Sequence, residues 1–231
     1  MDLIDLKEKC VEKGFELNEN QLKQFDKYAN LLIEWNKKIN LTAITEYNEI
    51  VEKHFLDSII PLLDEKLCGK LCDVGSGAGF PSIPMKIVDP SLEVVILEPI
   101  NKRCVFLNEV ISQLNLDNIT VYNVRSEDFV KKNREIFDIV IARAVANLSI
   151  LAELCIPLVK MDSYFIAMKG EKGIQESIDA TNATNILGCK LIKANEFMLN
   201  EFKRVNLVYK KIKKTPLKYP RNYSRIKKQP L

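Results

Sequence analysis

The chain has 231 residues, of which 47% are hydrophobic and 28% are charged. This length predicts one domain, or one domain with a small appendage, and the composition is that of a globular protein. No apolar run approaches the ~20 residues of a membrane-spanning helix, and the first residues lack the pattern of a signal peptide. The six cysteines form no Cys-x-x-Cys pair and there is a single histidine, so we expect a cytoplasmic protein with reduced thiols, no membrane association and no bound metal.

Positive charge is concentrated near the C-terminal end of the sequence. Eleven lysines and arginines and no acidic residue lie between Lys203 and Leu231, whereas the rest of the chain carries 23 basic and 31 acidic residues. A basic stretch on an acidic body indicates a polyanionic partner such as nucleic acid. A solvated charged tail in a lysine-rich protein is the alternative.

The first third of the chain is predicted to be helical. Apolar residues recur at helical spacing over residues 22–36, and Asn18 or Asn20 is expected to cap that helix. A second helix is predicted over residues 46–63. Together these segments predict an N-terminal helical subdomain over residues 1–63.

Short apolar strands alternate with helix-length segments from residue 64 onward. Strands are expected at residues 71–74, 93–97, 119–123, 137–141, 164–168, 190–196 and 204–212, with helices such as 102–114 and 148–158 between them. This alternation predicts an α/β domain over residues 64–212 with a mostly parallel, seven-stranded sheet. Residues 213–231 contain several prolines and are expected to form an extended basic tail.

A glycine-rich segment follows the first predicted strand. Gly75, Gly77 and Gly79 alternate with other residues immediately after Asp73, and Glu98 closes the next strand. Glycine allows positive φ angles and the close approach of a ligand, and a carboxylate at the end of the second strand can accept hydrogen bonds from ribose hydroxyls. The segment therefore predicts a site for an adenosine-containing cofactor.

The spacing of the glycines separates three interpretations. Phe80 stands where a dinucleotide fingerprint requires its third glycine, whereas Asp-x-Gly-x-Gly-x-Gly is typical of enzymes that bind S-adenosylmethionine (SAM). Asp73 can help to orient the charged amino-acid end of SAM, directly or through water. A nicotinamide or flavin cofactor and a purely structural glycine turn are the alternatives.

Motifs of other enzyme classes are weak or missing from the sequence. There is no phosphate-binding P-loop, and Ser76 does not stand in a Gly-x-Ser-x-Gly hydrolase motif. His54, Asp57 and Ser58 fall on one predicted helix. We expect them to form a polar packing cluster, with a catalytic triad as the alternative.

Motifs more specific than the glycine segment occur in order along nearly the whole chain. They are residues 35–42 (ending in Asn-Leu-Thr), 54–58 (His-x-x-Asp-Ser), 73–81, 101–103, 125–127, 142–146 (Ala-Arg-Ala-Val-Ala), 168–170 and 219–221. In these motifs the chain resembles the bacterial small-subunit ribosomal RNA (guanine-N7) methyltransferases, also called glucose-inhibited division protein B. The resemblance implies a Rossmann-like SAM-dependent enzyme that forms 7-methylguanine at one site in the decoding region of 16S ribosomal RNA. Its partner is then that RNA or the small ribosomal subunit.

The resemblance also implies site residues. The cofactor-binding set is Asp73, Gly75, Gly77, Phe80, Glu98, Ser126, Glu127 and Arg143. The loop from Gly75 to Phe80 would hold the methionine part of SAM, and Ser126 with Glu127 would lie beside the adenine. Arg143 would face the pocket shared by cofactor and substrate.

The chain departs from the family pattern at several positions. Glu98 stands where the family usually has Asp, Ser126 where it has Ala, and Ser82 where it has Gly. The C-terminal segment after Arg221 lacks the usual glycine and the proline–lysine pair. These changes leave the SAM assignment intact but put the RNA contact of the tail in doubt.

Methylation of guanine N7 restricts the catalytic residues that are needed. N7 carries an in-plane lone pair and no proton, so no general base is required, and the tasks are alignment and exclusion of water. Arg143 or Arg125 is expected to orient the guanine through O6 or a phosphate, although Arg143 could instead brace the cofactor pocket by a salt bridge. Asn40 is a second candidate for base contact, with a helix cap or turn as its alternative.

Contacts to the RNA backbone are expected from basic residues outside the pocket. The candidates are Arg125, Lys169 at a strand end, and the basic residues of the C-terminal segment, namely Lys210, Lys211, Lys213, Lys214, Arg221, Arg225, Lys227 and Lys228. Such contacts make binding salt-dependent. We expect the protein to act as a monomer.

Three other functions stay open at this point. A SAM enzyme for a small molecule would turn over without RNA, and a non-catalytic RNA-binding factor would bind RNA without SAM. A nicotinamide oxidoreductase is disfavoured because Phe80 replaces the third glycine of the fingerprint.

Overall fold

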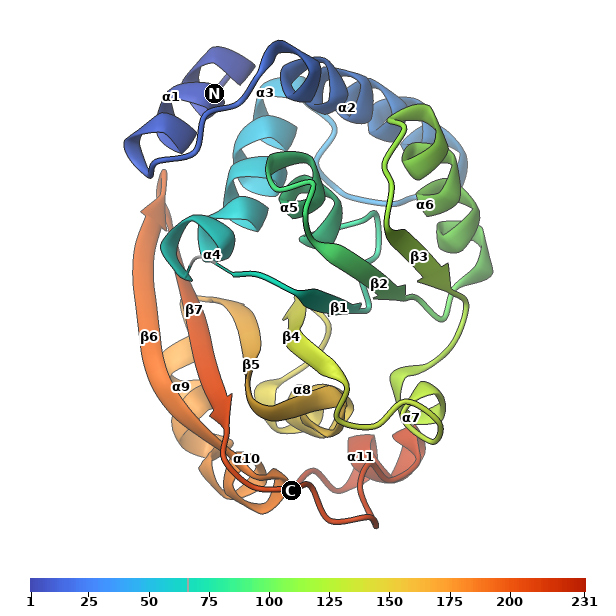
Figure 1. The fold of residues 1–231 in the computed structure, drawn as a ribbon, viewed down its shortest axis with the longest axis vertical. Helices are drawn as coiled ribbons and strands as arrows, with labels where there is room; N and C mark the ends of the chain where they lie inside the picture. The colour runs from blue at the N-terminus through green and yellow to red at the C-terminus, as the bar shows by residue number, and fades with distance from the viewer. Residues whose placement is uncertain (66) are drawn as a thin grey trace.

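The alternating apolar runs after Lys70 become the seven strands of one sheet (Figure 1). A computed structural model describes residues 1–65 and 67–231. The strands are β1 (Lys70–Val74), β2 (Glu93–Leu97), β3 (Ile119–Tyr122), β4 (Phe137–Arg143), β5 (Val159–Gly170), β6 (Cys189–Leu199) and β7 (Phe202–Lys211). They lie in the order β3-β2-β1-β4-β5-β7-β6, and only β7 runs antiparallel to its neighbours. The predicted α/β class with a mostly parallel, seven-stranded sheet is confirmed.

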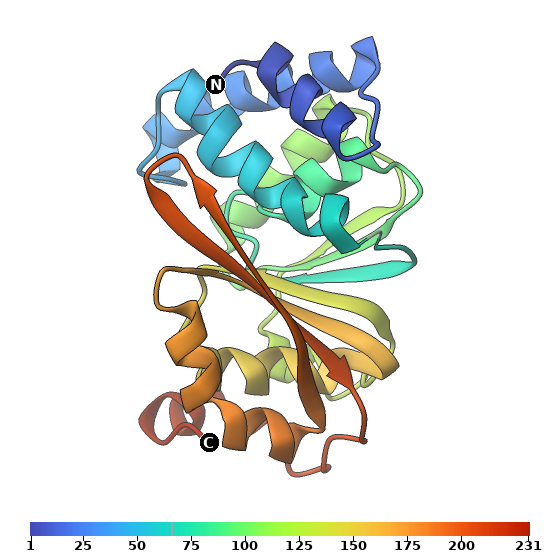
Figure 2. The same cartoon turned by 90° about the vertical axis from the view of Figure 1, so that its left-hand side faces the viewer.

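Helices cover both faces of this sheet, as the side view in Figure 2 shows. On one face lie α1 (Leu3–Glu12), α2 (Glu19–Ile39), α3 (Tyr47–Ile50), the π-helical segment η1 (Val51–Leu56), α4 (Asp57–Glu65), α5 (Ser82–Val88) and α6 (Asn101–Gln113). On the other lie α7 (Ser126–Phe129), α8 (Leu148–Cys155), the 3-10 segment η2 (Ile156–Leu158), α9 (Gly173–Asp179), α10 (Thr181–Leu187) and α11 (Tyr223–Lys228). Each helical layer buries its own apolar cluster against the sheet.

The long helix α2 has clear start and stop signals. Asn18, rather than Asn20, is its N-cap, and the Asn18 side chain and that of Gln21 accept hydrogen bonds from each other's backbone N–H groups. At the other end Asn40 adopts a left-handed conformation with φ of 47° and stops the helix. The amide of Gln21 also donates to the carbonyls of Ile87 and Val88, which fixes α2 on the end of α5.

The helix predicted over residues 46–63 is divided in the structure. A π-helical segment, η1, separates α3 from α4, and Pro61 lies inside α4. Proline has no N–H to donate to the carbonyl of Asp57, four residues earlier, so α4 lacks one of its α-helical hydrogen bonds at this point. The wider π turn carries His54.

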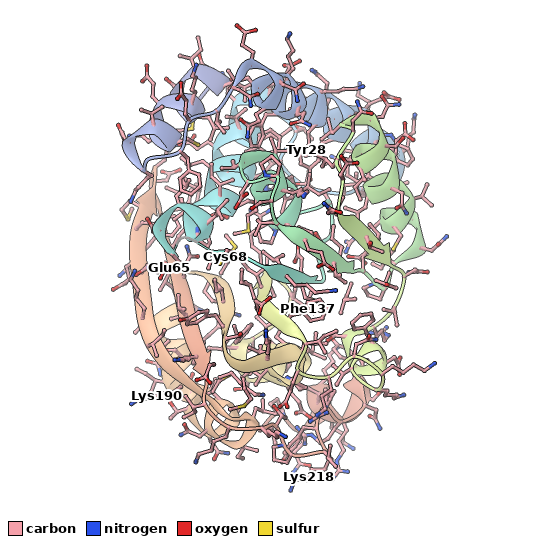
Figure 3. The ribbon with its side chains drawn as sticks, in the orientation of Figure 1. Tyr28, Glu65, Cys68, Phe137, Lys190 and Lys218 are labelled. Carbon is pink, nitrogen blue, oxygen red and sulfur yellow. The ribbon has the colours of Figure 1, made fainter. Side chains whose placement is uncertain are left out.

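Aromatic side chains join the N-terminal helices to the glycine-rich loop. The rings of Phe25 and Tyr28 each pack against Phe55, and Tyr28 also stacks on Phe80 with 5.6 Å between ring centroids. The Tyr28 hydroxyl donates a hydrogen bond to the carbonyl of Ala78. Figure 3 shows Tyr28 within the N-terminal helical layer, away from Phe137 on β4. The helical layer is therefore packed directly on the loop that follows β1.

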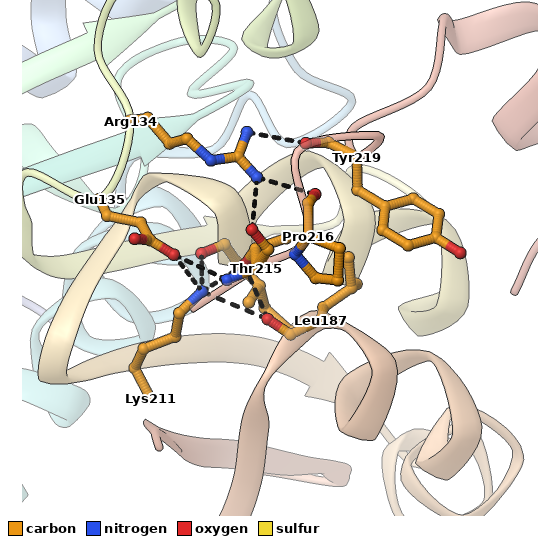
Figure 4. A network of polar contacts seen from close by, with 8 residues as sticks. Arg134, Glu135, Leu187, Lys211, Thr215, Pro216 and Tyr219 are labelled. Carbon is orange, nitrogen blue, oxygen red and sulfur yellow. Dashed lines mark hydrogen bonds and ion pairs between the residues drawn. The ribbon is translucent and has the colours of Figure 1, made fainter. Parts of the chain in front are cut away.

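The C-terminal segment is folded, and the expectation of an extended tail is wrong for much of it. Residues 223–228 form α11, whose Ile226 is fully buried. The guanidinium of Arg134 donates to the carbonyls of Thr215, Pro216 and Tyr219 (Figure 4). These anchors lie far apart in sequence, which is why composition and proline content alone suggested an extended chain.

Lys211 anchors the same region from inside the protein. Its side chain is fully buried, lies 3.3 Å from Glu135, and donates to the carbonyls of Ile156 and Leu187 and to the hydroxyl of Thr215 (Figure 4). Burial lowers the pKa of the Lys211 ammonium. The expectation that Lys211 contributes to a surface for RNA is therefore wrong.

Candidate active site

The residues predicted to form a site meet at one edge of the sheet. Because β1, β2, β4 and β5 are parallel, their carboxyl ends lie together. Gly75 follows β1, Glu98 follows β2, Arg143 ends β4, and Lys169 lies near the end of β5. This edge is where ligands bind in open α/β sheets.

Backbone geometry at the glycine-rich loop depends on its glycines. Gly75, Gly77 and Gly79 have φ angles of 73°, 64° and 101°, a region that other residues rarely adopt. The Glu98 carboxylate accepts hydrogen bonds from the N–H of Gly77 at 3.0 Å and of Ile100 at 2.9 Å. Glu98 thus holds the loop in place, and its oxygens keep lone pairs for further donors.

The space beside the three glycines differs. A Cβ atom on Gly75 would lie 2.9 Å from Val145, and one on Gly79 would lie 2.5 Å from the hydroxyl of Tyr28. A Cβ atom on Gly77 would meet no atom within 4 Å. Gly77 therefore faces open space. This space allows a ligand to approach the backbone of the loop.

Asp73 lies under this loop and is fully buried. One of its oxygens accepts hydrogen bonds from the backbone N–H and the hydroxyl of Ser82, at 3.2 and 2.7 Å. Burial raises the pKa of Asp73 to about 6. Among the described residues, the other oxygen of Asp73 and the hydroxyl of Ser76 have no hydrogen-bond partner. Asp73 thus fixes the start of α5, and two buried oxygen atoms are left for a ligand that carries N–H donors.

Arg143 is held by groups from the helical layer. Its guanidinium donates to the carboxylate of Asp57 at 2.9 Å and to the carbonyl of Lys53 at 3.2 Å, and it lies 3.0 Å from Nδ1 of His54. The guanidinium carbon lies 4.9 Å from the centre of the Phe80 ring. The structure thus contains the salt bridge that was the alternative for Arg143, while direct contact with guanine stays a prediction.

A cavity of about 610 Å³ opens beside this cluster. Its volume lies within the range of small-molecule sites. Charged and polar side chains from both layers line it, and they include Lys53, His54, Asp57, Arg143, Lys169, Glu176, Arg204 and Asn206. Residues 144–147, which connect β4 to α8, form another part of the wall. A planar base and its attached phosphates carry the polar groups that such a wall can recognise.

Lys169 lines the cavity and forms an ion pair there. Its ammonium lies 2.8 Å from the carboxylate of Glu176 and donates to the carbonyl of Ala146 at 2.6 Å. Glu176 in turn accepts a hydrogen bond from the N–H of Leu148. Lys169 therefore holds the β4–α8 connection in place, and its contact with RNA stays a prediction.

The segment expected beside the adenine lies at the start of α7. Ser126 is buried and donates to the carbonyl of Leu154, while Glu127 is half-buried. Arg125 is exposed, and its guanidinium carbon lies 5.2 Å from the ring centre of Tyr223 in the C-terminal segment. Contacts of these three residues with a ligand stay predictions.

Asn40 and Asn36 share the turn at the end of α2. Asn40 is exposed and caps the helix, which agrees with the alternative stated for it. The Asn36 side chain accepts hydrogen bonds from the N–H groups of Leu41 and Thr42, at 2.6 and 2.9 Å, and donates to the Thr42 carbonyl. Asn36 therefore fixes the path of the Asn-Leu-Thr segment towards the cavity.

The predicted RNA-contact residues of the C-terminal segment fall into two groups. Lys214, Arg225 and Lys228 are exposed. Arg221 instead pairs with the fully buried Glu153, with its guanidinium 2.6 Å from the carboxylate. The ion pair with Glu153 gives Arg221 a stabilising role, and its contact with RNA stays a prediction.

Three residues that were not predicted as site residues, His54, Asp57 and Thr42, lie at or beside Arg143. His54 and Asp57 touch Arg143, and the hydroxyl of Thr42 lies 2.8 Å from Nε2 of His54. The His-x-x-Asp-Ser motif pointed to His54 and Asp57. Their role could not be predicted, because their partner Arg143 on β4 is almost ninety residues away in sequence. The polar packing cluster expected there is thus in direct contact with the site.

Two further properties bear on cofactors and membranes. Within residues 1–65 and 67–231, no three His, Cys, Asp or Glu side chains gather as metal ligands. In the same part of the chain, no helix is both long and apolar enough to cross a membrane.

The strand order and the glycine-rich loop define a Rossmann-like methyltransferase fold, which solved structures share. A SAM dependent methyltransferase from Aquifex aeolicus matches with a TM-score of 0.57 at 14% identity, over 71% of this chain and 93% of that one. The 16S rRNA (adenine(1408)-N(1))-methyltransferase from Catenulisporales acidiphilia matches with a TM-score of 0.52 at 13% identity, over 64% of this chain and 86% of that one. At these identities the likeness concerns the fold.

Sequence relatives identify the family. The chain matches the family described as rRNA small subunit methyltransferase G over residues 21–205. Proteins named Ribosomal RNA small subunit methyltransferase G are 47% identical in Pediococcus pentosaceus, over 98% of this chain and 97% of the relative, and 46% identical in Staphylococcus epidermidis, over 100% and 99%. This chain belongs to the rRNA small subunit methyltransferase G family, which confirms the resemblance seen in its motifs.

Proposed function

We propose that this protein transfers a methyl group from SAM to N7 of one guanine in the decoding region of 16S ribosomal RNA. The observation that carries the proposal is membership of the rRNA small subunit methyltransferase G family over nearly the whole chain. A substrate of this kind places the enzyme in the cytoplasm, where we expect it to act as a monomer on the RNA or on the small subunit.

The glycine-rich loop and its surroundings fit SAM. Gly77 leaves open space where a Cβ atom would otherwise stand, and the Glu98 carboxylate retains lone pairs for the ribose hydroxyls. The unpaired oxygens of Asp73 and Ser76 suit the ammonium group at the amino-acid end of SAM. Ser126 and Glu127 are proposed to lie beside the adenine, and Phe80 beside the methionine part.

Methylation of guanine N7 requires no general acid or general base. When bound, SAM would supply an electrophilic methyl group for transfer to the lone pair of N7. The guanine N7 loses no proton, so the residues around the cavity need only orient the base and exclude water. His54 agrees with this, because Arg143 and Thr42 already occupy its two ring nitrogens.

The charged side chains around the cavity suit a guanine that becomes positively charged when it is methylated. Arg143 and Arg204 can donate to O6 or to a phosphate, while N7 stays free. The Asp57 carboxylate lies between them, 2.9 Å from Arg143 and 3.6 Å from Arg204, and offsets their charge as the methylated base turns cationic. Arg125, Lys214, Arg225 and Lys228 are proposed to contact RNA phosphates from the exposed surface.

Chemical mapping of 7-methylguanine in 16S RNA tests the proposal. Borohydride reduction and aniline cleavage would be applied to RNA from cells with and without the gene. We expect one cleavage in the decoding region to disappear on deletion and to return when the purified protein acts on that RNA with SAM. An unchanged cleavage pattern would contradict the substrate, and methylation of small molecules would then be tested.

A further inference from the structure

His54 joins two parts of the site, one at the end of a sheet strand and one in the helical layer. On one side of its ring, Nδ1 lies 3.0 Å from the guanidinium of Arg143 at the end of β4. On the other side, Nε2 lies 2.8 Å from the hydroxyl of Thr42 in the turn that follows α2. The ring therefore bridges the Asn-Leu-Thr segment and the wall of the cavity.

The chemistry of the neighbours fixes the proton on this ring. An arginine side chain is always protonated and can only donate, so Nδ1 must accept and carries no hydrogen. The single proton of the neutral imidazole is then on Nε2, which donates to the Thr42 hydroxyl. That hydroxyl oxygen also accepts from the N–H of Ile44 at 3.1 Å.

The surroundings keep the ring neutral and leave it little freedom. The imidazole stacks on Phe80 with 4.4 Å between centroids and 19° between planes, and only 8% of His54 is exposed. The charged groups that face it are Arg143 from β4 and, one turn further along its own helical segment, Asp57. Burial, with Arg143 second, lowers the pKa of His54 to about 3.

We propose that His54 is a positioning residue that, as the neutral tautomer with its proton on Nε2, ties the direction of the Arg143 guanidinium to the Thr42 turn. This inference rests on the proposed methylation, because Arg143 is the group that orients the base there. Asn36 fixes the Thr42 turn, Thr42 fixes the ring, and the ring fixes Arg143. The guanidinium is thus aimed before RNA arrives, which lowers the reorganisation needed at the reacting step.

Two substitutions separate the two sides of the ring. In His54→Asn the side-chain oxygen can take the place of Nδ1 and accept from Arg143, but it cannot reach Thr42. In His54→Gln the amide nitrogen can take the place of Nε2 and reach Thr42, but the side chain has no acceptor for Arg143. His54→Phe keeps the stacking on Phe80 and loses both hydrogen bonds.

Steady-state methylation of 16S RNA gives the first readout. We expect His54→Asn and His54→Gln, which each keep one half of the link, to lower kcat about ten-fold, and His54→Phe to lower it up to about 100-fold, with SAM affinity unchanged in all three. SAM affinity is measured by calorimetry and serves as the control for folding. Wild-type kcat in the Asn variant, the Gln variant or the Phe variant would overturn the proposal.

The tautomer gives a second readout that needs no activity. His54 is the only histidine of the chain, so a long-range 1H–15N spectrum of the labelled protein reports one imidazole. We expect an unprotonated Nδ1 and a protonated Nε2 across about pH 5 to 8, and a displaced Nε2–H signal in Thr42→Val. A proton on Nδ1, or titration at the ordinary histidine pKa, would overturn the proposal even if RNA methylation is confirmed. If the wild-type protein methylates no RNA while the expected tautomer is seen, the proposed function fails and the geometry of His54 stands.

Discussion

His54 and Asp73 are buried ionisable residues that respond to pH in opposite directions. The pKa of His54 falls to about 3 in the folded protein, so below its ordinary value the unfolded chain binds a proton that the folded chain does not. Its contribution to stability is complete above about pH 6.5 and is lost as the pH falls towards 3. The pKa of Asp73 rises to about 6, so its contribution is present at low pH and is lost as the pH rises through 6.

We predict that His54→Gln removes the loss of stability at low pH that the depressed pKa of His54 causes. Between about pH 7 and about pH 5.5, the difference in unfolding free energy between the wild-type protein and the variant should change by roughly 1 kcal/mol, with the wild type losing more. Urea unfolding at each pH measures this. Asp73 is present in both proteins and cancels in the comparison, so parallel pH profiles would show that His54 is not held neutral.

The glycine-rich loop allows a matched pair of substitutions. Gly77→Ala and Gly79→Ala both place a side chain at a positive φ, which costs about 1 kcal/mol in each case. Only in Gly79→Ala does the new Cβ atom meet protein atoms, 2.5 Å from the Tyr28 hydroxyl and 2.6 Å from Ile83. We therefore expect Gly79→Ala to lose more stability and Gly77→Ala to lose more SAM affinity.

Unfolding curves and SAM calorimetry on both alanine variants measure this prediction. If Gly77→Ala binds SAM with the affinity of the wild type, the open side of Gly77 does not face the cofactor.

The positions of site residues could be predicted where one short segment carries the whole signal. The glycines and Glu98 are of this kind, because a strand, a turn and the next strand end are enough to place them. Arg143, Lys169 and Arg221 are different, since their ion-pair partners Asp57, Glu176 and Glu153 are chosen by tertiary packing. The sequence showed their charge but not whether the charge was already neutralised.

Among the elements, the C-terminal segment depends on a buried ion pair. Glu153 on α8 is fully buried, and Arg221 is its partner. We predict that Arg221→Ala destabilises the protein by about 3 kcal/mol, because it leaves a buried carboxylate without compensation. Thermal or urea unfolding checks the value.

A double variant provides the control for this ion pair. Arg221→Met with Glu153→Met replaces both charges by apolar groups and should recover most of the lost stability. A single Arg221→Ala variant that unfolds like the wild type would show that the segment is not held by this pair.

Helices and strands that have a clear hydrophobic pattern in the sequence lie close to their predicted positions. Those that have no such pattern were not predicted. The strands were predicted from short apolar runs, although β5 begins five residues before its predicted start and β4 extends to Arg143. The π-helical segment and α11 were missed, since neither has a characteristic hydrophobic period. Helix α11 has just six residues and one fully buried apolar side chain, Ile226.

For the whole molecule, the position of charge matters more than its net value of +3. The exposed residues Lys214, Arg225 and Lys228 belong to a segment that packs beside α7, the element expected near the adenine. Replacing all three by Gln should weaken RNA binding and reduce the slope of log K against log salt concentration by about two to three. Filter binding or fluorescence anisotropy at several salt concentrations measures the slope.

An equal charge change elsewhere is the control for this prediction. Lys7, Lys9 and Lys23 lie on α1 and α2, and replacing them by Gln removes the same three charges from a different face. If both triple variants reduce the slope equally, binding responds to net charge and not to this surface.

The hydrogen bond from Tyr28 to the carbonyl of Ala78 has a consequence for how the protein can be divided. The sequence suggests a helical piece and a catalytic piece, yet a side chain of the first supports the backbone of the loop on which the second depends. A shortened protein that begins near residue 64 would keep every residue of the glycine-rich loop, and Glu98 beneath it, but would lose the support that Tyr28 gives. Modular engineering of this fold, by grafting or trimming the helical layer, therefore has to carry Tyr28 and its aromatic neighbours along with the loop.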